Sequence, residues 1–582
     1  MKQTLRLSKN FFGSKFTYPS VYLGRSSKAL SNENFYKVED KIKAHDCCNQ
    51  IYNSIISDLA RNLNILHKVN YSLRSWNIIL GYWLRLFIHS IYENYFILDK
   101  TLKNLDIEEI FSFYPEEYDL FTLDTYALYF TVLDEKWNCA LNSKIVKFFN
   151  IKKKIIYKKS EEKYLSNQET FSTRKTYYKK NPIFNFLNLI GKVFNIFKKD
   201  KYACIYKTYL PFVYEKKLEI KMGQLPQFWN DKKISFKPYD KNLRKEIDLK
   251  SNANSSKFEE FLRVILPSSL PVFVLESFKD INELSEKSDY PKDPSFIFTS
   301  EAFAYDEVFK FYTAKKTQDG VPYFIGQHGN SYFTHVYNNY AIEVDVCDKF
   351  ISWGFKDNHK VIPTFNFKTL GRRKLFNNKG KFLVVFRQVN ISGLPMFDLP
   401  AQEKGSFESA IEIISGLNTK IQSQTVARLF PGNHHNLEPF YKDLLKNLNI
   451  KIETGNKHLR DLLKESRLTF FNYDSTGILE NLALNIPTIC FWNNIFGFIN
   501  PNAVDMYKLL IDAKILFKDP KELIKHVENN WLDISSWWMS KNTQELIKEF
   551  NSRINVPPKK DSLENLKKIL IQATKQSTAN EY

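Results

Sequence analysis

The sequence has few cysteines and no pattern that would pair them. Its six cysteines include no Cys-x-x-Cys motif and have no regular spacing, and several lie in apolar runs. Free cysteines of this kind are typical of proteins kept in a reducing compartment, where they act as small buried hydrophobic residues. The pattern excludes a disulfide-stapled fold.

The sequence also lacks long hydrophobic runs. No stretch of about 18 uncharged apolar residues is present, so no membrane span is predicted. The segment MKQTLRLSKNFFGSKF at the N-terminus has no unbroken apolar core of the kind that a secretory signal needs. We therefore expect a cytoplasmic protein, either free or peripheral to the inner face of the plasma membrane.

Repeats and nucleic-acid-binding motifs are absent as well. No fixed period recurs along the chain, which argues against a solenoid or a propeller. The net charge is +20, but zinc-finger spacing, RNP-like aromatic motifs and a basic zipper are missing, so nucleic acid is not an expected partner. Half of the positive excess lies in residues 151–201, which hold 14 Lys and Arg against 4 Asp and Glu.

That basic segment contains an amphipathic pattern over residues 183–197. Its polar positions are spaced by 3, 4 and 3 residues, which gives a helix one narrow polar stripe and one broad apolar face. Lysines flank the pattern within residues 179–201, as in helices that lie in a lipid headgroup layer. Two interpretations stay open: contact with an anionic membrane surface, or packing against the protein's own core.

The chain does contain enough apolar residues for several large cores. Of its 582 residues, 43 % are apolar and 15 % are aromatic, far more than a disordered chain carries. This length suits two or three domains. In the N-terminal half, helical patterns cover about residues 46–66 and 72–95, and in the second a polar stripe recurs every four positions from Asn77 to His89. Short apolar strands are predicted at residues 19–23, 294–300, 321–326 and 348–353.

The alternation of strands and helices restarts after a polar joint at residues 371–380. Strands are predicted at residues 382–386, 425–430, 450–453, 468–472 and 488–492. Helices are predicted at residues 407–416, 437–448, 459–465, 476–485, 520–531 and 534–550. Repeated βα units of this kind indicate a doubly wound parallel sheet with helices on both faces.

The predicted fold class is therefore α/β, with two Rossmann-like doubly wound domains and helical additions in the N-terminal half. The N-terminal domain is assigned to residues 16–372 and includes the basic amphipathic segment. The C-terminal domain is assigned to residues 373–550. Residues 551–582 are polar and rich in lysine, and are predicted to form a loose tail.

Polar residues at the carboxyl ends of the predicted strands are the candidate site residues, because ligands of open α/β sheets bind there. His328 follows a strand, and its imidazole can exchange a proton near neutral pH, so it is the predicted catalytic residue. Its neighbours Gln327 and Gly329 are predicted to bind substrate. Glu301 and Asp306 are predicted catalytic carboxylates, with helix capping as the alternative for Asp306.

Two later strand ends carry candidate nucleotide-binding groups. The planar guanidinium of Arg428 can hold a phosphate, and a helix that begins near Ser475 would point N–H groups at an anion, with an ordinary N-cap as the compatible alternative. The predicted nucleotide-binding residues are Arg428, Asn472, Ser475, Thr476, Gly477 and Glu480. No metal site is predicted, because the adjacent His434 and His435 have no acidic partner at useful spacing.

Several stretches, spread in order over most of the chain, resemble a family of transferases encoded in gene clusters for O-antigen and other surface polysaccharides. They include the runs at residues 71–76, 81–84, 325–329, 352–354, 428–431, 475–493 and 537–538. The run Ser-Thr-Gly-x-x-Glu-x-x-Ala-x-x-x-Pro-Thr within the sixth stretch also resembles nucleotide-sugar glycosyltransferases of the GT-B type.

The resemblance implies that the two domains face a cleft, with the nucleotide held by the C-terminal half and the acceptor by the N-terminal half. Residues 428–431 are similar in placement to a motif of bacterial CMP-sugar transferases that usually reads His-Pro, whereas this chain has Phe430-Pro431. GT-B enzymes usually work without a bound metal, because an Arg and a helix N-terminus neutralise the leaving phosphate. We therefore expect no cofactor beyond the nucleotide-sugar donor.

The predicted function is transfer of a sugar from a nucleotide sugar to a glycan acceptor of the O-antigen or capsule type, free or lipid-linked. His328 with Asp306 or Glu301 would act on the acceptor side. Two alternatives stay open. One is a polyol-phosphate transferase of the same fold that uses a CDP-alcohol, and the other is a non-catalytic glycan-binding or assembly protein.

Overall fold

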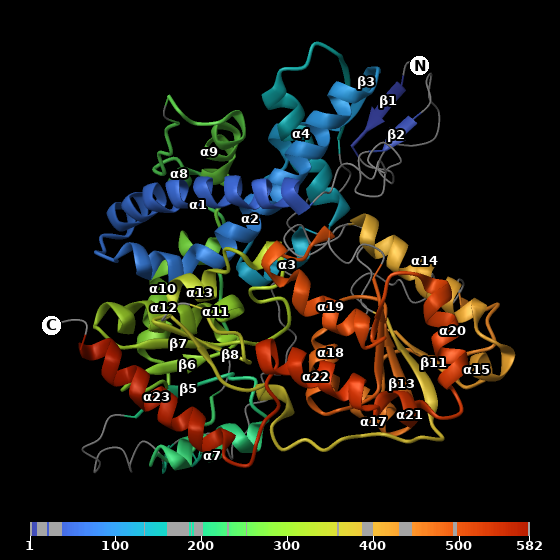
Figure 1. Ribbon diagram of the computed structural model, residues 1–582. Helices are drawn as coiled ribbons and strands as arrows, with labels where there is room; N and C mark the ends of the chain where they lie inside the picture. The colour runs from blue at the N-terminus through green and yellow to red at the C-terminus, as the bar shows by residue number, and fades with distance from the viewer. Residues whose placement is uncertain are drawn as a thin grey trace.

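The computed structural model describes residues 3–7, 20–22, 38–132, 134–159, 186–187, 189–190, 202–229, 232–251, 253–357, 360–386, 400–429, 445–492 and 497–579. Within these ranges the chain forms three sheets in which all paired strands are parallel (Figure 1). One sheet forms the C-terminal lobe and another the N-terminal lobe, and two long helices lie between the latter and a third sheet near the N-terminus. The predicted α/β class with parallel sheets is confirmed.

The C-terminal lobe is built on a six-stranded sheet with the order β12-β11-β10-β13-β14-β15. Its strands are β10 (Lys381–Val385), β11 (Thr425–Arg428), β12 (Lys451–Glu453), β13 (Ser466–Phe471), β14 (Thr488–Phe491) and β15 (Leu516–Phe517). The direction of the order reverses between β10 and β13, which is the doubly wound Rossmann order 3-2-1-4-5-6. The five predicted strands are confirmed, and β15 is an addition at the edge.

Four helices of this lobe agree with the predicted ones, one predicted helix is divided in two, and the helices at Thr419–Ser423 and Val504–Asp512 were not predicted. The helices of the lobe are α14 (Pro400–Gly416), α15 (Thr419–Ser423), α17 (Leu459–Lys464), α18 (Thr476–Ala483), α19 (Val504–Asp512), α20 (Pro520–Asn530), α21 (Ile534–Trp538) and α22 (Lys541–Ile554). The helix predicted at residues 534–550 is divided, because Ser540 accepts a hydrogen bond from the N–H of Thr543 and starts a new helix. Most of the helix predicted at residues 437–448 lies outside the described residues.

The N-terminal lobe is built on a five-stranded sheet whose strands follow chain order, β5-β6-β7-β8-β9. The strands are β5 (Cys204–Ile205), β6 (Ile297–Thr299), β7 (Tyr323–Gly326), β8 (Lys349–Ser352) and β9 (Val361–Pro363). The accompanying helices are α7 (Phe212–Lys221), α8 (Lys241–Arg244), α9 (Lys257–Ser269), α10 (Phe278–Glu286), α11 (Ala302–Tyr305), α12 (Glu307–Gln318) and α13 (Ile342–Val346). The three strands predicted between residues 294 and 353 are confirmed.

The prediction of a loose tail at residues 551–582 is wrong. Residues Ser562–Ala579 form helix α23, which packs against α7 of the N-terminal lobe (Figure 1). Leu563, Leu566, Leu570 and Ala573 are buried, because their spacing places them on one face of a helix. The abundant lysines lie on the other faces of the helix. Because they make the segment polar on average, its composition did not indicate a packed helix. The chain thus returns to the N-terminal lobe after it has completed the C-terminal one.

A third sheet lies near the N-terminus and is not part of the predicted fold, apart from one strand. Its order is β2-β1-β3-β4, with β1 (Gln3–Arg6), β2 (Ser20–Tyr22), β3 (Ile107–Phe113) and β4 (Lys154–Lys158). Helix α4 (Glu135–Phe149) packs against β3, and helix α3 (Thr125–Thr131) precedes it. The predicted start of the first domain at residue 16 is therefore also wrong, because β1 precedes it and pairs with β3.

Helices α1 (Val38–His67) and α2 (Leu73–Asn104) are long and pack against each other (Figure 1). The polar stripe predicted on α2 faces α1. Asn77 accepts a hydrogen bond from the hydroxyl of Tyr52, and a Cβ at Gly81 would lie 2.7 Å from the same hydroxyl oxygen. The glycine therefore permits the close approach of the two helices.

His89 of that stripe lies beside a second imidazole, and both rings are half-buried. The rings of His45 on α1 and His89 on α2 lie 4.7 Å apart between centroids. Burial lowers the pKa of His45 to about 4, and burial also lowers the pKa of His89 well below its usual value. Both side chains are therefore neutral in the folded protein at neutral pH.

This pair predicts a pH-dependent stability. Below pH about 6.5 the unfolded chain protonates both histidines while the folded protein does not, so the free energy of unfolding falls as pH decreases towards 4. Each histidine contributes up to about 1.4 kcal/mol per pH unit. Urea-unfolding midpoints measured from pH 7 to pH 5 should decline less steeply for the double variant His45→Gln, His89→Gln. Equal slopes for the variant and the parent, with exposed His458→Gln as control, would contradict this account.

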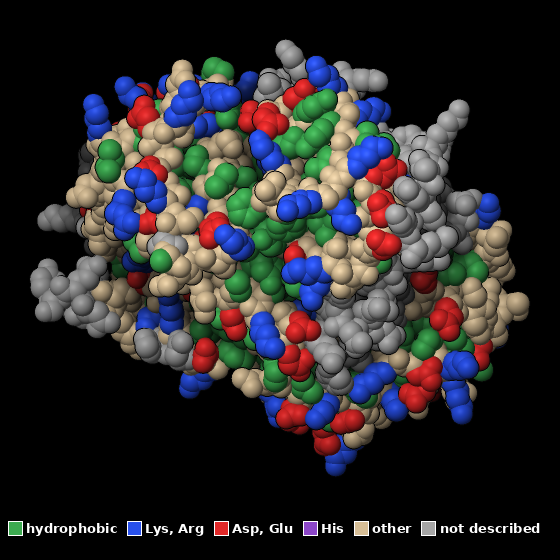
Figure 2. Space-filling view, turned by 90° about the horizontal axis from the view of Figure 1, so that it is seen from above, with side chains coloured by type: hydrophobic (Ala, Val, Ile, Leu, Met, Phe, Trp, Pro, Cys, Tyr) green, Lys and Arg blue, Asp and Glu red, His purple; other side chains and the backbone are tan. Residues whose placement is uncertain are grey.

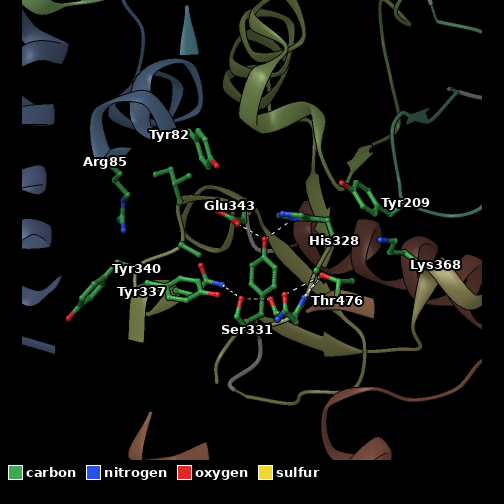
Figure 3. A pocket seen from close by; sticks show the side chains of 16 residues that line it. Tyr82, Arg85, Tyr209, His328, Ser331, Tyr337, Tyr340, Glu343, Lys368 and Thr476 are labelled. Atoms are coloured by element: carbon green, nitrogen blue, oxygen red, sulfur yellow. Dashed lines mark hydrogen bonds between the residues drawn. The ribbon is translucent and has the colours of Figure 1, made fainter. Parts of the chain in front are cut away.

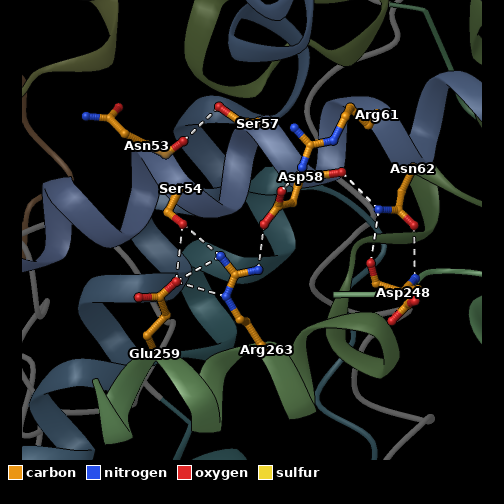
Figure 4. Close-up of polar contacts among 9 residues, drawn as sticks. All are labelled: Asn53, Ser54, Ser57, Asp58, Arg61, Asn62, Asp248, Glu259 and Arg263. Atoms are coloured by element: carbon orange, nitrogen blue, oxygen red, sulfur yellow. Dashed lines mark hydrogen bonds and ion pairs between the residues drawn. The ribbon is translucent and has the colours of Figure 1, made fainter. Parts of the chain in front are cut away.

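Helix α9 is joined to α1 by a buried polar cluster around Arg263 (Figure 4). The guanidinium donates to Glu259 at 2.9 Å, to Asp58 at 2.6 Å and to the hydroxyl of Ser54 at 2.8 Å. Its side chain is 1 % exposed, so these three contacts replace all of its hydration.

The surface shows no concentration of positive charge on the face seen in Figure 2, where Lys and Arg are interspersed with Asp and Glu. Of the amphipathic pattern at residues 183–197, only residues 186–187 and 189–190 are described, and Phe186, Leu189 and Ile190 are exposed. The rest of the segment and its flanking lysines lie outside the described residues. Contact of residues 179–201 with a membrane stays a prediction. None of the helices in the described ranges is both long and apolar enough to cross a bilayer.

Candidate functional site

A cavity of about 310 Å³ lies beyond the carboxyl end of β7, where the two lobes meet (Figure 3). Its lining comes from helix α2, the segment after β5, the loop after β7, helix α13, the segment near residue 368 and the first residue of α18 in the C-terminal lobe. The lining residues are Tyr82, Arg85, Tyr209, His328, Gly329, Asn330, Ser331, Tyr332, Tyr337, Asn338, Tyr340, Ala341, Ile342, Glu343, Lys368 and Thr476.

His328, the predicted catalytic residue, lines this cavity. The rings of Tyr209, Phe303 and Tyr332 surround its imidazole, with centroids 5.4 to 5.9 Å away. Burial lowers the pKa of His328 to about 4, and the positive charge of Lys368 adds to this effect. The imidazole is therefore neutral at pH 7 and can accept a proton.

Tyr332 and Glu343 also line the cavity, although the sequence did not single them out. Tyr332 is hydrogen-bonded to His328, and Glu343 is hydrogen-bonded to Tyr332. The hydroxyl of Tyr332 lies 2.8 Å from Nδ1 of His328, and it also donates a hydrogen bond to the carboxylate of Glu343 (Figure 3). Burial raises the pKa of Glu343, whereas the hydrogen bond from Tyr332 and the charge of Arg85 lower it. Among the described residues that line the cavity, Glu343 is the one with a carboxylate.

Neither predicted catalytic carboxylate lines the cavity. Asp306 caps helix α12 by accepting a hydrogen bond from the N–H of Phe309 at 3.1 Å, and it also accepts from the hydroxyl of Tyr206 at 3.2 Å. Asp306 is thus a helix cap in the structure, which is the alternative that the sequence left open. Glu301 precedes helix α11 and makes no side-chain cap there.

The predicted substrate residues beside His328 differ in their roles. Gln327 does not line the cavity, because its amide donates to the carbonyl of Gly329 at 2.8 Å and accepts from the N–H of Trp353 at 2.8 Å. Those bonds hold the loop that carries His328. Gly329 does line the cavity, and a Cβ there would lie 3.2 Å from Oγ1 of Thr476 in the other lobe.

Thr476 is the predicted nucleotide-binding residue that reaches the cavity. Its hydroxyl accepts from the N–H of Asn330 at 3.3 Å and donates to the amide oxygen of Asn330 at 3.2 Å. Ser475 is the N-cap of α18 and accepts from the N–H of Gly477 at 3.1 Å. A Cβ on Gly477 would lie 2.9 Å from the ring of Phe471, so the glycine lets the helix start close against β13.

Arg428 and Asn472 lie at the same edge of the six-stranded sheet but outside the lining of the cavity. Arg428 on β11 and Phe471 on β13 are both paired with Val385 of β10, which lies between these two strands. Arg428 and Asn472 therefore stand at the ends of strands separated by two inter-strand spacings, about 10 Å. Burial lowers the pKa of Arg428, although its guanidinium stays charged. Residues 430–435, which complete this predicted motif, lie outside the described residues.

Glu480, predicted to bind the nucleotide, is paired with two cations of the N-terminal lobe. Its carboxylate lies 2.8 Å from Nζ of Lys368 and 2.7 Å from a guanidinium nitrogen of Arg372. A nucleotide hydroxyl that bonds to Glu480 would therefore have to displace one of these contacts.

The loop that follows His328 also holds the two lobes together. His335 lies 2.6 Å from Asp474, and both side chains are buried. The backbone adopts left-handed φ angles at Ser331, Phe333 and Tyr209, of 72°, 65° and 61°. Such angles are costly for residues with a side chain and are concentrated at functional sites.

The expectation of a metal-free site is not tested by these contacts. In the parts of the chain that are described, no three His, Cys, Asp or Glu side chains come together as metal ligands would. The absence of metal chemistry stays a prediction.

The chain is similar to several solved structures at low sequence identity. The spinosyn rhamnosyltransferase SpnG, complexed with spinosyn aglycone, is 12 % identical over 51 % of this chain and 77 % of its own, with a TM-score of 0.29. Anabaena Alr3699/HepE in complex with UDP-glucose is 9 % identical over 55 % and 89 %, with a TM-score of 0.31. A Listeria monocytogenes protein described as a UDP-N-acetylglucosamine 2-epimerase is 12 % identical over 63 % and 95 %, with a TM-score of 0.35.

These scores are too low to support conclusions about site or substrate, and no curated protein matches the chain. The family comparison reaches further, because the profile of the LIC12162 family transferases matches residues 22–570. That range contains both lobes, the cavity and every site residue predicted above. The chain belongs to the LIC12162 family of transferases.

Proposed function

We propose that this transferase moves a sugar from a nucleotide sugar to a hydroxyl of a surface-polysaccharide glycan of the O-antigen or capsule type, free or lipid-linked, in the cytoplasm. The observation that carries the proposal is the neutral imidazole of His328 in a cavity where the two lobes meet. Transfer to a hydroxyl needs a base at the acceptor and a site for the leaving phosphate. His328 and the start of α18 face the same space from opposite lobes.

In the proposed reaction the acceptor oxygen bonds to the anomeric carbon of the sugar, and its proton passes to His328. The bond between that carbon and the phosphate oxygen breaks, and its electron pair leaves with the nucleotide. Arg428 and the N–H groups at the start of α18 would neutralise the charge that develops on the phosphate. In this proposed reaction the donor binds at the edge of the six-stranded sheet and the acceptor binds beside α2 and α13.

A nucleotide-binding test decides the first part of the proposal. The melting temperature of the full-length protein is expected to rise with one of CMP, CDP, UDP, GDP or dTDP, because a ligand at 100 times its Kd stabilises the folded state by about 2.7 kcal/mol. Arg428→Ala should lose this increase, whereas Arg460→Ala, which removes an exposed guanidinium elsewhere in the same lobe, should retain it. No increase with any of the five nucleotides would reject the proposed donor class.

The transferred group is identified by mass spectrometry of the product. A mass increase of one glycosyl residue supports the proposal, and an increase of one polyol phosphate supports the alternative reaction of the same fold. The matching nucleotide from the binding screen selects the donor to be used.

A further inference from the structure

The position of the proton on His328 follows from the contacts beneath the cavity. His328, Tyr332 and Glu343 form a hydrogen-bonded triad in which the tyrosine hydroxyl is the middle member (Figure 3). Tyr332 and Glu343 are both buried, so water does not replace either bond. Among the described residues, no side chain or backbone group other than Tyr332 is hydrogen-bonded to the imidazole of His328.

Counting donors determines the direction of each bond in this triad. An ionised carboxylate can only accept, and a phenol carries one proton, so the proton of Tyr332 is used in the bond to Glu343. The hydroxyl oxygen can then only accept from the histidine at 2.8 Å. The proton of the neutral imidazole must therefore be on Nδ1.

We infer that Glu343 is a positioning residue which, through Tyr332, holds the proton of His328 on Nδ1 and leaves the lone pair of Nε2 directed at the acceptor. Its role in transfer rests on the proposed function, whereas the tautomer itself does not. Were Glu343 protonated, both hydrogen bonds could reverse and the proton would move to Nε2, where it would block the base.

Burial raises the pKa of Glu343, whereas the hydrogen bond from Tyr332 and the charge of Arg85 act in the opposite direction, so the charged state of this carboxylate is part of the inference. Arg85 on α2 lies near Glu343 and is itself paired with Asp345 at 2.5 Å, so one cation serves both carboxylates. Tyr82 and Tyr209 face Tyr332, and Lys368 faces His328. Tyr82 and Tyr209 are uncharged phenols, and Arg85 and Lys368 are the cations of this environment; of these two, Arg85 acts to lower the pKa of Glu343.

The tautomer can be measured without any substrate. Nitrogen-15 NMR of the full-length protein labelled at histidine separates protonated from unprotonated ring nitrogens, and the signals of His328 are those missing in His328→Gln. At pH 7 we expect the proton of His328 on Nδ1. In Tyr332→Phe, which removes the acceptor but keeps the ring, the proton is expected to move largely to Nε2. In Glu343→Gln, whose amide can donate or accept, a mixture of both forms is expected.

A buried tyrosine outside the cavity provides the matched control. Tyr312 donates its hydroxyl to the carbonyl of Pro291, so Tyr312→Phe deletes a buried hydroxyl without touching the triad. The signals of His328 should be unchanged in this variant. A proton on Nε2 in the parent protein, or unchanged signals in Tyr332→Phe with a retained melting transition, would overturn the inference.

Kinetics test the role of the triad in transfer. Both Tyr332→Phe and Glu343→Gln should lower kcat about 10- to 100-fold, because the base is lost from part of the population while binding is not. The KM for the donor should change less than about twofold in each. A merely structural role would instead raise KM together with lowering kcat. If the tautomer changes as expected and no donor is turned over by the parent protein, the proposed function fails and the inferred tautomer stands.

Discussion

His328→Ala is expected to lower the rate of sugar transfer by about 10²- to 10⁴-fold, the usual contribution of a positioned general base. The imidazole is neutral at pH 7 and lines the cavity between the lobes, whereas the residues proposed to hold the nucleotide lie in the other lobe. Release of free nucleotide in the presence of acceptor measures the rate. The nucleotide-dependent increase in melting temperature should persist in the variant.

The control for this prediction is His458→Ala, which removes an exposed histidine from the start of α17 and should leave both measurements unchanged. Because the pKa of His328 is about 4, kcat/KM should be level between pH 5 and pH 8 and decline only as pH falls towards 4. Loss of nucleotide binding together with transfer, in a folded His328→Ala variant, would contradict the assigned division of roles.

Arg263→Ala is expected to produce the largest loss of stability, about 3 to 5 kcal/mol. The substitution leaves the carboxylate of Glu259 buried without its cation, and uncompensated buried charge is far more costly than the net stabilisation of the intact pair. The loss of the packed guanidinium between α9 and α1 adds to the effect (Figure 4). Urea unfolding followed by circular dichroism measures the change.

Arg61→Ala provides a close control, because Arg61 contacts the same Asp58 from the surface (Figure 4). Its side chain is 73 % exposed, against 1 % for Arg263, so water replaces the lost contact. We expect a change within about 0.5 kcal/mol. Similar losses for the two variants would show that burial does not determine the strength of these arginine contacts.

Most strands of the two lobes were predictable because they are short apolar runs followed by turn residues, whereas the short strands β5, β9 and β15 at the sheet edges were not predicted. β7 and β13 illustrate this, since polar residues follow both immediately and the ligand edge of a parallel sheet is the carboxyl edge. His328 and Thr476 could be identified for the same reason. The four-stranded sheet could not, because β1 and its partner β3 are separated by about a hundred residues and β3 carries two glutamates.

Of the remaining site residues, Glu343 and Lys368 had no local signal, and the polar stripe that contains Arg85 did not indicate a site. Glu343 lies on a one-turn helix, Lys368 lies near the joint between the lobes, and Arg85 lies on a mostly buried helix. None follows a strand, and only the folding of distant segments brings them to His328. Asp306 did have a local signal, but the signal was ambiguous. A carboxylate that follows a strand is equally suited to capping the next helix, and this is what Asp306 does in the structure.

Three features of this protein follow from its sequence alone. They are the parallel α/β lobes, the polar stripe on the second long helix and the imidazole at a strand end. These features depend on residue periodicity and on short-range turn chemistry, both of which are local. The tertiary structure decided which carboxylate lies beneath the imidazole, which cations hold Glu480, and where the last helix packs. Those contacts join segments separated by tens to hundreds of residues, and their geometry arises only when the packed lobes exclude water between them.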